Sequence, residues 1–506
     1  FLHRDRLEQV TVDQVREVAK KYLVRNNRTV GVFLPTSDAE RVSIPPTPSL
    51  AELVDGYKGR EELALGEAFD VSPENIEKRT KRLTLSTGIN AALLPKKTRG
   101  EMVRIRLSLR YGTPETLAPY ATAAEFLPAL MARGTQRLNR TELQDELDRL
   151  RAELRTLGVP GMATFILQTK KENLPELLGL LRQILRQPAL DPVELDLLKQ
   201  RQRATLQQSL TDPQSLAIRS LVRRMTDYAS NDVRYVPTIA EELQRVEALS
   251  NQDVSNLYRE FLNGTNGQLS VVGDFDPATI QPLLEELFVA WTSSIPYQRI
   301  ERSVPGQWVP NHERIQIPDK ANAVYTAGLV FPLRDDHPDY APLSLGNFIL
   351  GAGALSSRLG DRIRQKEGLS YGVISSISAD PLDQRATFSV TAICNPAKAE
   401  RVNIAAKEEI ARLLADGPTP EEIERARNGY LERQQVTRTN DDDLAQILNV
   451  TLFAGRTMDH YATLEAQIRE LTPQQVTEAL RKYIDVAKLT SIEAGDFTEK
   501  PAETKK

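Results

Sequence analysis

Three segments of this chain repeat one pattern of polar and apolar residues, and their spacing constrains the fold more than any other feature. They are residues 10–23, 249–262 and 471–484, and each places Thr or Ser ahead of apolar residues at helical spacing. A Thr or Ser in that position is the usual N-cap of a helix. The second and third segments begin 222 residues apart, and the first and second begin 239 apart. We therefore interpret each segment as the last helix of a repeated domain.

Other short matches occur at nearly the same spacing and extend the repeat to whole domains. The matching pairs are 163–165 with 386–388, 191–194 with 419–422, and 272–275 with 494–497. We predict a tail of a truncated preceding domain at 1–35, a proline-bearing linker at 36–75, one full domain at 76–300 and a second at 301–506. The tail would keep only a final helix and a strand through Val30–Phe33, so the parent protein is expected to hold four such domains.

The pattern within one copy indicates strands with helices packed on them. Residues 102–110 alternate strictly between apolar and polar, which is typical of a half-buried antiparallel strand. Thr141 and Gln144 frame a capping box, and Leu143, Leu147 and Leu150 follow as a helical stripe. The predicted fold class is α+β, with tandem homologous domains that each have an antiparallel sheet covered by helices.

Composition and charge exclude several classes of function. The 506 residues contain 65 Lys and Arg against 69 Asp and Glu, a formal net charge of −4, which gives no basic surface for nucleic acid. No run approaches the roughly 18 apolar residues of a membrane span, so no membrane insertion is expected. The single cysteine, Cys394, permits no internal disulfide and is interpreted as a small buried residue in a strand.

No motif for a metal or a nucleophile is complete in this sequence. The four histidines lie far apart, so neither H-E-x-x-H nor H-x-x-E-H occurs, and we predict that the chain binds no metal. The glycine-rich residues 351–360 lack the G-K-[ST] ending of a phosphate loop. The acidic run 441–443 is interpreted as the N-terminus of a helix. The four histidines are His3, His312, His337 and His460.

One short span, residues 362–373, combines a charged helix end, a glycine turn and a tyrosine that begins a strand. An arginine and a tyrosine that converge there could hold a peptide carbonyl and donate a hydrogen bond to a developing oxyanion. The residues alone favour a simpler interpretation, a solvated helix end and a tyrosine at a strand edge. The candidates are Arg364 and Tyr371, seven residues apart.

This span and its surroundings resemble the C-terminal-half signature of the pitrilysin/insulinase (inverzincin) family of zinc metallopeptidases. The matching residues are 350–353, 356–359, 364–369 and Tyr371, together with the V-x-G-D-F-like domain endings and residues 27–30 and 110–115. The resemblance implies a two-half assembly around a closed chamber, in which an N-terminal half holds zinc in H-x-x-E-H. Arg364 would then bind and orient the peptide, and Tyr371 would stabilise the tetrahedral intermediate, so that both are catalytic and substrate-binding residues.

The chain departs from the family at the position of the zinc motif. Where the zinc-bearing domain would read H-F-L-E-H, residues 125–129 read Glu-Phe-Leu-Pro-Ala. Ala129 cannot bind a metal, and Pro128 is expected to disturb the helix that such ligands need. The first full domain is therefore predicted to be degenerate, and the chain alone is predicted to be inactive.

Three hypotheses follow for the function. The first is the C-terminal half of a zinc endopeptidase, which acts on peptides or unfolded polypeptides only with a zinc-bearing half or a homologous subunit. The second is a non-catalytic structural subunit of the same fold, and the third is a solenoid-like scaffold, which repeats of about 220 residues disfavour. The resemblance to exported bacterial members predicts a periplasmic or secreted protein, with the cytoplasm or an organelle matrix as the alternative.

Overall fold

The computed structural model describes residues 6–7, 9–32, 65–353 and 356–498, and it separates into two compact units, 1–65 and 66–506. In the first unit, helix α2 (Val12–Tyr22) begins at a capping box on Thr11, as the repeat predicts. Residues 30–32 form no strand, contrary to expectation, because this unit offers no neighbouring strand for them to pair with among its described residues. Phe33 and most of the predicted linker lie outside the described residues.

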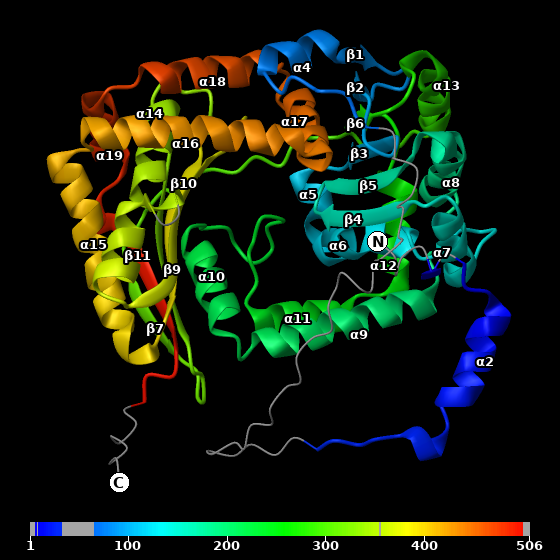
Figure 1. The fold of residues 1–506 in the computed structure, drawn as a ribbon, viewed down its shortest axis with the longest axis horizontal. Coiled ribbons are helices and arrows are strands. Elements are labelled where there is room, and N and C mark those ends of the chain that lie inside the picture. Colours follow the sequence, from blue (N-terminus) through cyan, green and yellow to red (C-terminus); the bar gives the residue numbers. More distant parts are fainter. Residues whose placement is uncertain (1–5, 8, 33–64, 354–355, 499–506) are drawn as a thin grey trace, which may run out of the picture. The chain divides into compact units, whose positions relative to one another are not determined.

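The first of two sheets in residues 66–506 has six strands in the order β1-β2-β6-β3-β5-β4 (Figure 1). The antiparallel strand predicted at residues 102–110 is confirmed, and Val103, Ile105, Leu107 and Leu109 of β3 are all buried, but the strand is not half-buried, because Ser108 on its other face is buried too. The strands are β1 (Lys81–Thr84), β2 (Asn90–Pro95), β3 (Met102–Arg110), β4 (Glu153–Val159), β5 (Met162–Lys170) and β6 (Gly267–Gly273).

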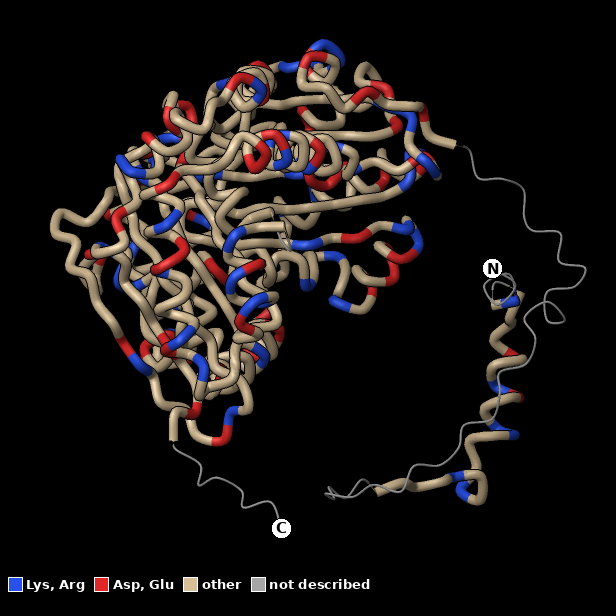
Figure 2. Tube along the Cα trace, turned by 60° about the vertical axis from the view of Figure 1, so that its left-hand side comes forward, with Lys and Arg blue, Asp and Glu red and all other residues tan. Residues whose placement is uncertain are grey.

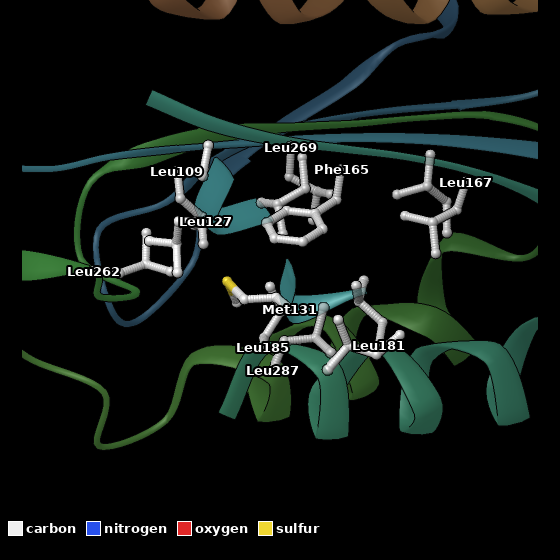
Figure 3. Close-up of a cluster of buried hydrophobic side chains, with 14 of the residues drawn as sticks. Leu109, Leu127, Met131, Phe165, Leu167, Leu181, Leu185, Leu262, Leu269 and Leu287 are labelled. Atoms are coloured by element: carbon white, nitrogen blue, oxygen red, sulfur yellow. The ribbon is translucent and has the colours of Figure 1, made fainter. Parts of the chain in front are cut away.

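Helices from the same stretch of chain cover one face of this sheet and form its main core. Leu127 and Met131 of α6 meet Leu181 and Leu185 of α8 beneath the strand residue Phe165 (Figure 3). This stretch of chain contains the helices α4 (Pro73–Arg79), α5 (Pro114–Leu117), α6 (Ala121–Met131), α7 (Arg140–Arg149), α8 (Leu174–Arg186), α9 (Pro192–Ser209), α10 (Pro213–Arg224), α11 (Ile239–Ala248), α12 (Asn251–Asn256) and α13 (Pro277–Phe288), of which α4 and α10 pack elsewhere.

The second sheet has five strands in the order β7-β11-β8-β10-β9. Its strands are β7 (His312–Gln316), β8 (Ala323–Phe331), β9 (Ser370–Ala379), β10 (Ala386–Cys394) and β11 (Thr490–Gly495). Its helical segments are α14 (Tyr340–Asn347), η5 (Phe348–Ala352), η7 (Gly360–Lys366), α15 (Ala399–Asp416), α16 (Pro420–Thr439), α17 (Asp441–Ala454), α18 (Asp459–Glu470) and α19 (Pro473–Tyr483).

The α+β class is confirmed, but neither sheet is purely antiparallel. The last strand of each copy enters the sheet interior, where β6 runs parallel to β2 and β11 runs parallel to β7. Several helices separate the two strands of each parallel pair in the chain, and a parallel pair requires such a long crossover connection. The other neighbouring strands are antiparallel.

The two sheets exchange one helix each. Helix α10, from the first stretch of chain, packs on β8 and β11 of the second sheet, and α17 packs on β6 and β3 of the first (Figure 1). Leu221 of α10 is buried with Val324 and Ile492, whereas Leu448 of α17 is buried with Ala92 and Val272. Each sheet therefore has at least part of its second face covered by a helix from the other copy.

Charged residues of both signs are interspersed along the chain trace (Figure 2), as the near-zero net charge leads one to expect. Among the described residues, no helix has the length and apolar character that a membrane crossing needs.

Candidate functional site

Helix α6 carries the residues at the position of the zinc motif, and only one of them is a metal-ligand type. Phe126 and Leu127 are buried in the core of the first sheet, and Ala129 has no ligand atom. The helix continues through Pro128 to Met131, so the expectation that this proline disturbs it is wrong. These residues do not fit a zinc ion, because a lone carboxylate replaces the two histidines and one glutamate of the motif.

Helix α6 packs tightly on the edge strand β4 at the position of Pro128. Proline lacks an N–H, so the carbonyl of Ala124, four residues before Pro128, receives no helical bond from it. That carbonyl lies against Gly158 of β4, where an added Cβ would come within 2.2 Å of its oxygen. The strand and the helix thus meet at backbone distance, and a side chain at 158 would separate them.

A cavity of about 940 Å³ lies beside α6, between α10, α11 and the loop that joins them. Glu125 lines it, and burial, followed by the nearby charge of Glu242, raises the pKa of Glu125 to about 7. The Glu125 side chain is exposed to the cavity, and the surrounding protein limits the solvation of its carboxylate. Glu242 itself is bound by Arg219 and by Gln202 at 3.3 Å.

Arg364 and Tyr371 both lie at the surface of the second sheet's edge. Arg364 is exposed in the last turn of η7, and Tyr371 is 87% exposed near the start of β9. Neither side chain forms a hydrogen bond or ion pair within the part of the chain that the structure describes. Their roles in catalysis and substrate binding remain predictions.

A β-bulge determines the direction of Tyr371. On β10, Cys394 pairs with Ser370 and the adjacent Ile393 pairs with Gly372, so Tyr371 is the extra residue of the edge strand. The Ser370 hydroxyl replaces the backbone hydrogen bonds that the bulge interrupts. It accepts from the Gly372 N–H at 3.1 Å and donates to the Ile393 carbonyl at 2.6 Å. A bulge of this kind redirects one side chain out of the regular alternation, and bulges are common beside active sites.

Ion pairs fix the segment that leads to Tyr371. Glu367 lies between the two candidate residues and is held by Arg362 and by Arg401, whose Nε is 2.7 Å away. Hydrogen bonds from Arg401 and Arg362 hold the pKa of Glu367 below its ordinary value. Arg358 anchors the preceding turn through a bidentate pair with Glu422, at 2.8 and 2.7 Å. The exposed Arg364 and Tyr371 thus project from a firmly attached segment.

One group of possible metal ligands was missed by the sequence analysis. Ligand atoms of His312, Glu400 and Glu493 lie within 4.8 Å of one another, although the residues come from β7, α15 and β11. Arg314 binds both carboxylates, at 2.9 Å to Glu400 and 2.7 Å to Glu493, and so supplies the cation that this cluster needs. No short-range spacing signals the group, because its members are far apart in sequence.

Two minor interpretations of the sequence are confirmed. Cys394 is buried in β10, and burial raises the pKa of its thiol to about 11, which makes it unreactive. The run 441–443 forms the first turn of α17, which is capped by Asn440. Of the four histidines, His3 lies outside the described residues.

Comparison with known proteins places these features in a family context. Residues 248–430 match the family model described as the peptidase M16 inactive domain. The non-peptidase homolog YmxG of Helicobacter pylori is 22% identical over 182 residues, which cover 35% of this chain and 40% of that relative. The match thus spans less than half of that relative's length.

Three solved structures share the fold. The peptidase M16 inactive domain from Pseudomonas fluorescens superposes with a TM-score of 0.71 at 20% identity, over 83% of this chain and 100% of that one. A protease from Helicobacter pylori gives 0.72 at 15% identity, over 82% and 99%. The periplasmic protease PqqL from Escherichia coli gives 0.66 at 13% identity, over 96% of this chain but 50% of PqqL.

Proposed function

We propose that this chain is the accessory half of a zinc endopeptidase. The premise is that residues 248–430, which match the peptidase M16 inactive domain, relate the chain to that family. In this proposal the chain holds a peptide or unfolded polypeptide, and a zinc-bearing half or homologous subunit carries the metal. Arg364 binds a peptide carbonyl, and the Tyr371 hydroxyl donates a hydrogen bond to the developing oxyanion. The chain alone is inactive.

The observation that carries this proposal is the position of Tyr371. A tyrosine that is 87% exposed at a bulge, on a segment fixed by ion pairs, contributes little to packing. Its hydroxyl has no partner within the described residues and is available to a bound peptide. The edge strand β9 also offers unpaired backbone groups beside Tyr371, with which an extended peptide could pair.

A non-catalytic structural subunit is the second candidate. The relative YmxG is named a non-peptidase homolog, and α6 of this chain lacks the residues of a zinc site. In this alternative the exposed Tyr371 has no catalytic role, and the chain supports a partner only through its surface.

The test compares the chain alone with the chain mixed with its zinc-bearing half, using a quenched fluorescent peptide of unstructured sequence. We expect no cleavage and no stoichiometric zinc for the chain alone, and chelator-sensitive cleavage on mixing. Tyr371→Phe should lower kcat by about a hundredfold, the usual effect of losing one oxyanion donor. Arg364→Gln should mainly raise KM.

Matched controls separate the two candidates. Tyr258→Phe changes a tyrosine of the first sheet's core whose hydroxyl donates to the Leu185 carbonyl at 3.0 Å, away from the proposed site, and should leave cleavage unchanged. If the mixture cleaves equally well with Tyr371→Phe, or remains inert although the halves bind each other, the structural-subunit candidate is favoured. Zinc bound tightly by the chain alone would contradict both.

We also propose a periplasmic location. The support is the name of one protein that shares the fold, the periplasmic protease PqqL. Fractionation of the producing cells checks this, and recovery in the cytoplasmic fraction would refute it.

A further inference from the structure

A second cavity, of about 340 Å³, lies on the face of the second sheet that α10 leaves open. Its floor is formed by Thr387, Ser389 and Thr391 of β10, and its wall by Ile218 and Val222 of α10. It shares Ile218, Val222 and Arg302 with the larger cavity beside Glu125, so the two spaces adjoin. A volume in this range holds a small ligand or one to two residues of a peptide.

Three arginines line this cavity, and no acidic residue does. Arg234 is already neutralised, since its guanidinium binds Asp232 at 2.8 and 2.7 Å. The guanidinium of Arg302 forms no hydrogen bond or ion pair among the described residues; only its backbone N–H is engaged, by Asp383 at 2.9 Å. The cavity therefore contains positive charge that no carboxylate of its lining balances.

Arg385, the residue just before β10, is the most constrained of the three. Its Nη2 donates to the Met225 carbonyl at 3.3 Å, whereas its Nε is shielded from solvent and has no hydrogen-bond partner in the described chain. Burial and the charge of Arg302 lower the pKa of Arg385, and the nearby carboxylates of Asp380 and Asp383 offset this only in part. A buried donor without a partner is costly, and a bound acceptor would remove that cost.

The remaining lining adds apolar surface and free hydroxyls. Ile218 and Val222 are partly exposed on the side of α10 that faces the cavity. The hydroxyls of Thr387 and Ser389 form no hydrogen bond with other described residues. A ligand that fits must therefore join an anionic group to an apolar one, with room for a few hydrogen bonds.

We propose that this cavity binds the C-terminal residue of a peptide, with the α-carboxylate on Arg302 and Arg385 and an apolar side chain against Ile218 and Val222. A planar carboxylate matches the fork of a guanidinium, and the apolar wall discriminates against inorganic anions. The preceding residues of the peptide would extend into the adjoining cavity beside Glu125. This inference rests on the proposed function, because it specifies which end of a bound peptide the chain holds.

The test uses calorimetric titration of the full chain with two pairs of ligands. One pair is a flexible ten-residue peptide that ends in leucine, as the free acid and as the C-terminal amide. The other is N-acetyl-leucine and its amide, which probe the cavity without the rest of a peptide. We expect each acid to bind at least about tenfold more tightly than its amide, as a charge-assisted pair implies.

Variants assign that preference to the cavity. Arg302→Gln changes an exposed residue and is expected to fold normally, and both Arg302→Gln and Arg385→Gln should abolish the preference for the acid. Arg412→Gln changes an exposed arginine of α15, which does not line this cavity, and as the matched control it should preserve the preference. Higher salt should weaken the acids more than the amides.

The outcomes distinguish this inference from the function on which it rests. Equal binding of acid and amide peptides, unchanged in Arg302→Gln, would overturn the inference and leave peptide holding intact. Arginine-dependent binding of N-acetyl-leucine without binding of the longer peptide would support the cavity and count against peptide holding. Competition by inorganic phosphate at lower concentration than N-acetyl-leucine would also overturn it, because the ligand would then be a simple anion.

Discussion

The exchanged helices α10 and α17 occupy equivalent places in the two copies, yet they close their sheets differently. Helix α17 is joined to the first sheet by a buried polar network, in which Asn449 donates to the carbonyls of Arg106 and Gln268 at 3.2 and 3.0 Å. The Ser108 hydroxyl donates to the Asn449 Oδ1 at 3.0 Å, and Ser270 donates to a carbonyl of α17.

Helix α10 has no such network on the second sheet. Its apolar residues pack on β8 and β11, its Ser220 donates to Glu313 at 2.8 Å near the rim, and β10 stays uncovered. Strand β10 lines the cavity that contains Arg302 and Arg385. The same kind of helix exchange thus produces a closed interface between α17 and the first sheet and an open one between α10 and the second. The difference lies in how many strands each helix covers, and the open interface leaves room for a ligand.

The largest expected effect on the free energy of unfolding is at the end of α16, the helix that directly precedes α17. Arg438, at the end of α16, is 1% exposed, pairs with buried Glu465 at 2.7 Å and donates to the Val71 carbonyl. Arg438→Met leaves Glu465 buried without its main partner and should lower the free energy of unfolding by about 3–5 kcal/mol. Equilibrium unfolding in urea measures it.

The control for this prediction uses the same carboxylate. Arg469 pairs with Glu465 from an exposed position, so Arg469→Ala should cost under about 1 kcal/mol. Replacing Arg438 by Met and Glu465 by Leu together should recover much of the loss, and a double variant as unstable as Arg438→Met would show that packing dominates there.

The second prediction compares the two helices directly. Asn449→Leu removes three buried hydrogen bonds of α17 and should cost about 2–3 kcal/mol, whereas Ser220→Ala on α10 should cost under about 1 kcal/mol. Both values come from the same urea titration. Equal costs would contradict the distinction between a sealed and an open interface.

The third prediction concerns pH at the larger cavity beside α10. The folded protein raises the pKa of Glu125 from 4.5 to about 7, so the native state binds its proton more tightly than the unfolded state does. Stability should therefore fall as pH rises from about 4.5 to 7. Because cavity water screens the charge, the loss should be only about 1 kcal/mol.

Glu125→Gln tests this dependence. The variant should match the wild type at pH 4 and be about 1 kcal/mol more stable at pH 8. Thermal unfolding at both pH values provides the measurement, and a difference of the same size at pH 4 would assign the effect to packing instead of ionisation.

The smallest effects are expected at the residues assigned to ligands. Tyr371→Phe and Arg302→Gln alter exposed side chains without partners in the described chain, so each should change stability by less than about 0.5 kcal/mol. A larger loss in either variant would indicate a structural role and weaken the corresponding functional proposal.

The sequence predicts the individual helices and strands of this fold better than it predicts which of them pack together. The cap at Thr11 and the alternation of residues 102–110 identify elements correctly, since they depend on neighbouring residues, whereas the capping box expected at Thr141 and Gln144 lies two residues earlier, at Asn139 and Glu142. The exchange of α10 and α17 is not predictable in this way. An amphipathic pattern shows that a helix has a buried face but not which sheet covers it.

The same limit applies to the sites. Arg364 and Tyr371 lie close in sequence, so a family motif can point to them, and their roles await the mixing experiment. Arg302 and Arg385 lie more than eighty residues apart. They share one cavity only because β10 and the segment before β7 meet beneath α10. Only the three-dimensional structure shows that the buried Nε of Arg385 has no hydrogen-bond partner among the described residues.

The exchanged helices α10 and α17 also restrict where the chain can be cut into separate fragments. A cut near residue 300 would produce one fragment that has lost α17 and one that has lost α10, and each would expose an apolar sheet face. Such fragments are expected to aggregate when expressed separately and to recover only when produced together. Duplication or loss of a single copy by recombination would meet the same obstacle, so we expect the two copies to be kept together.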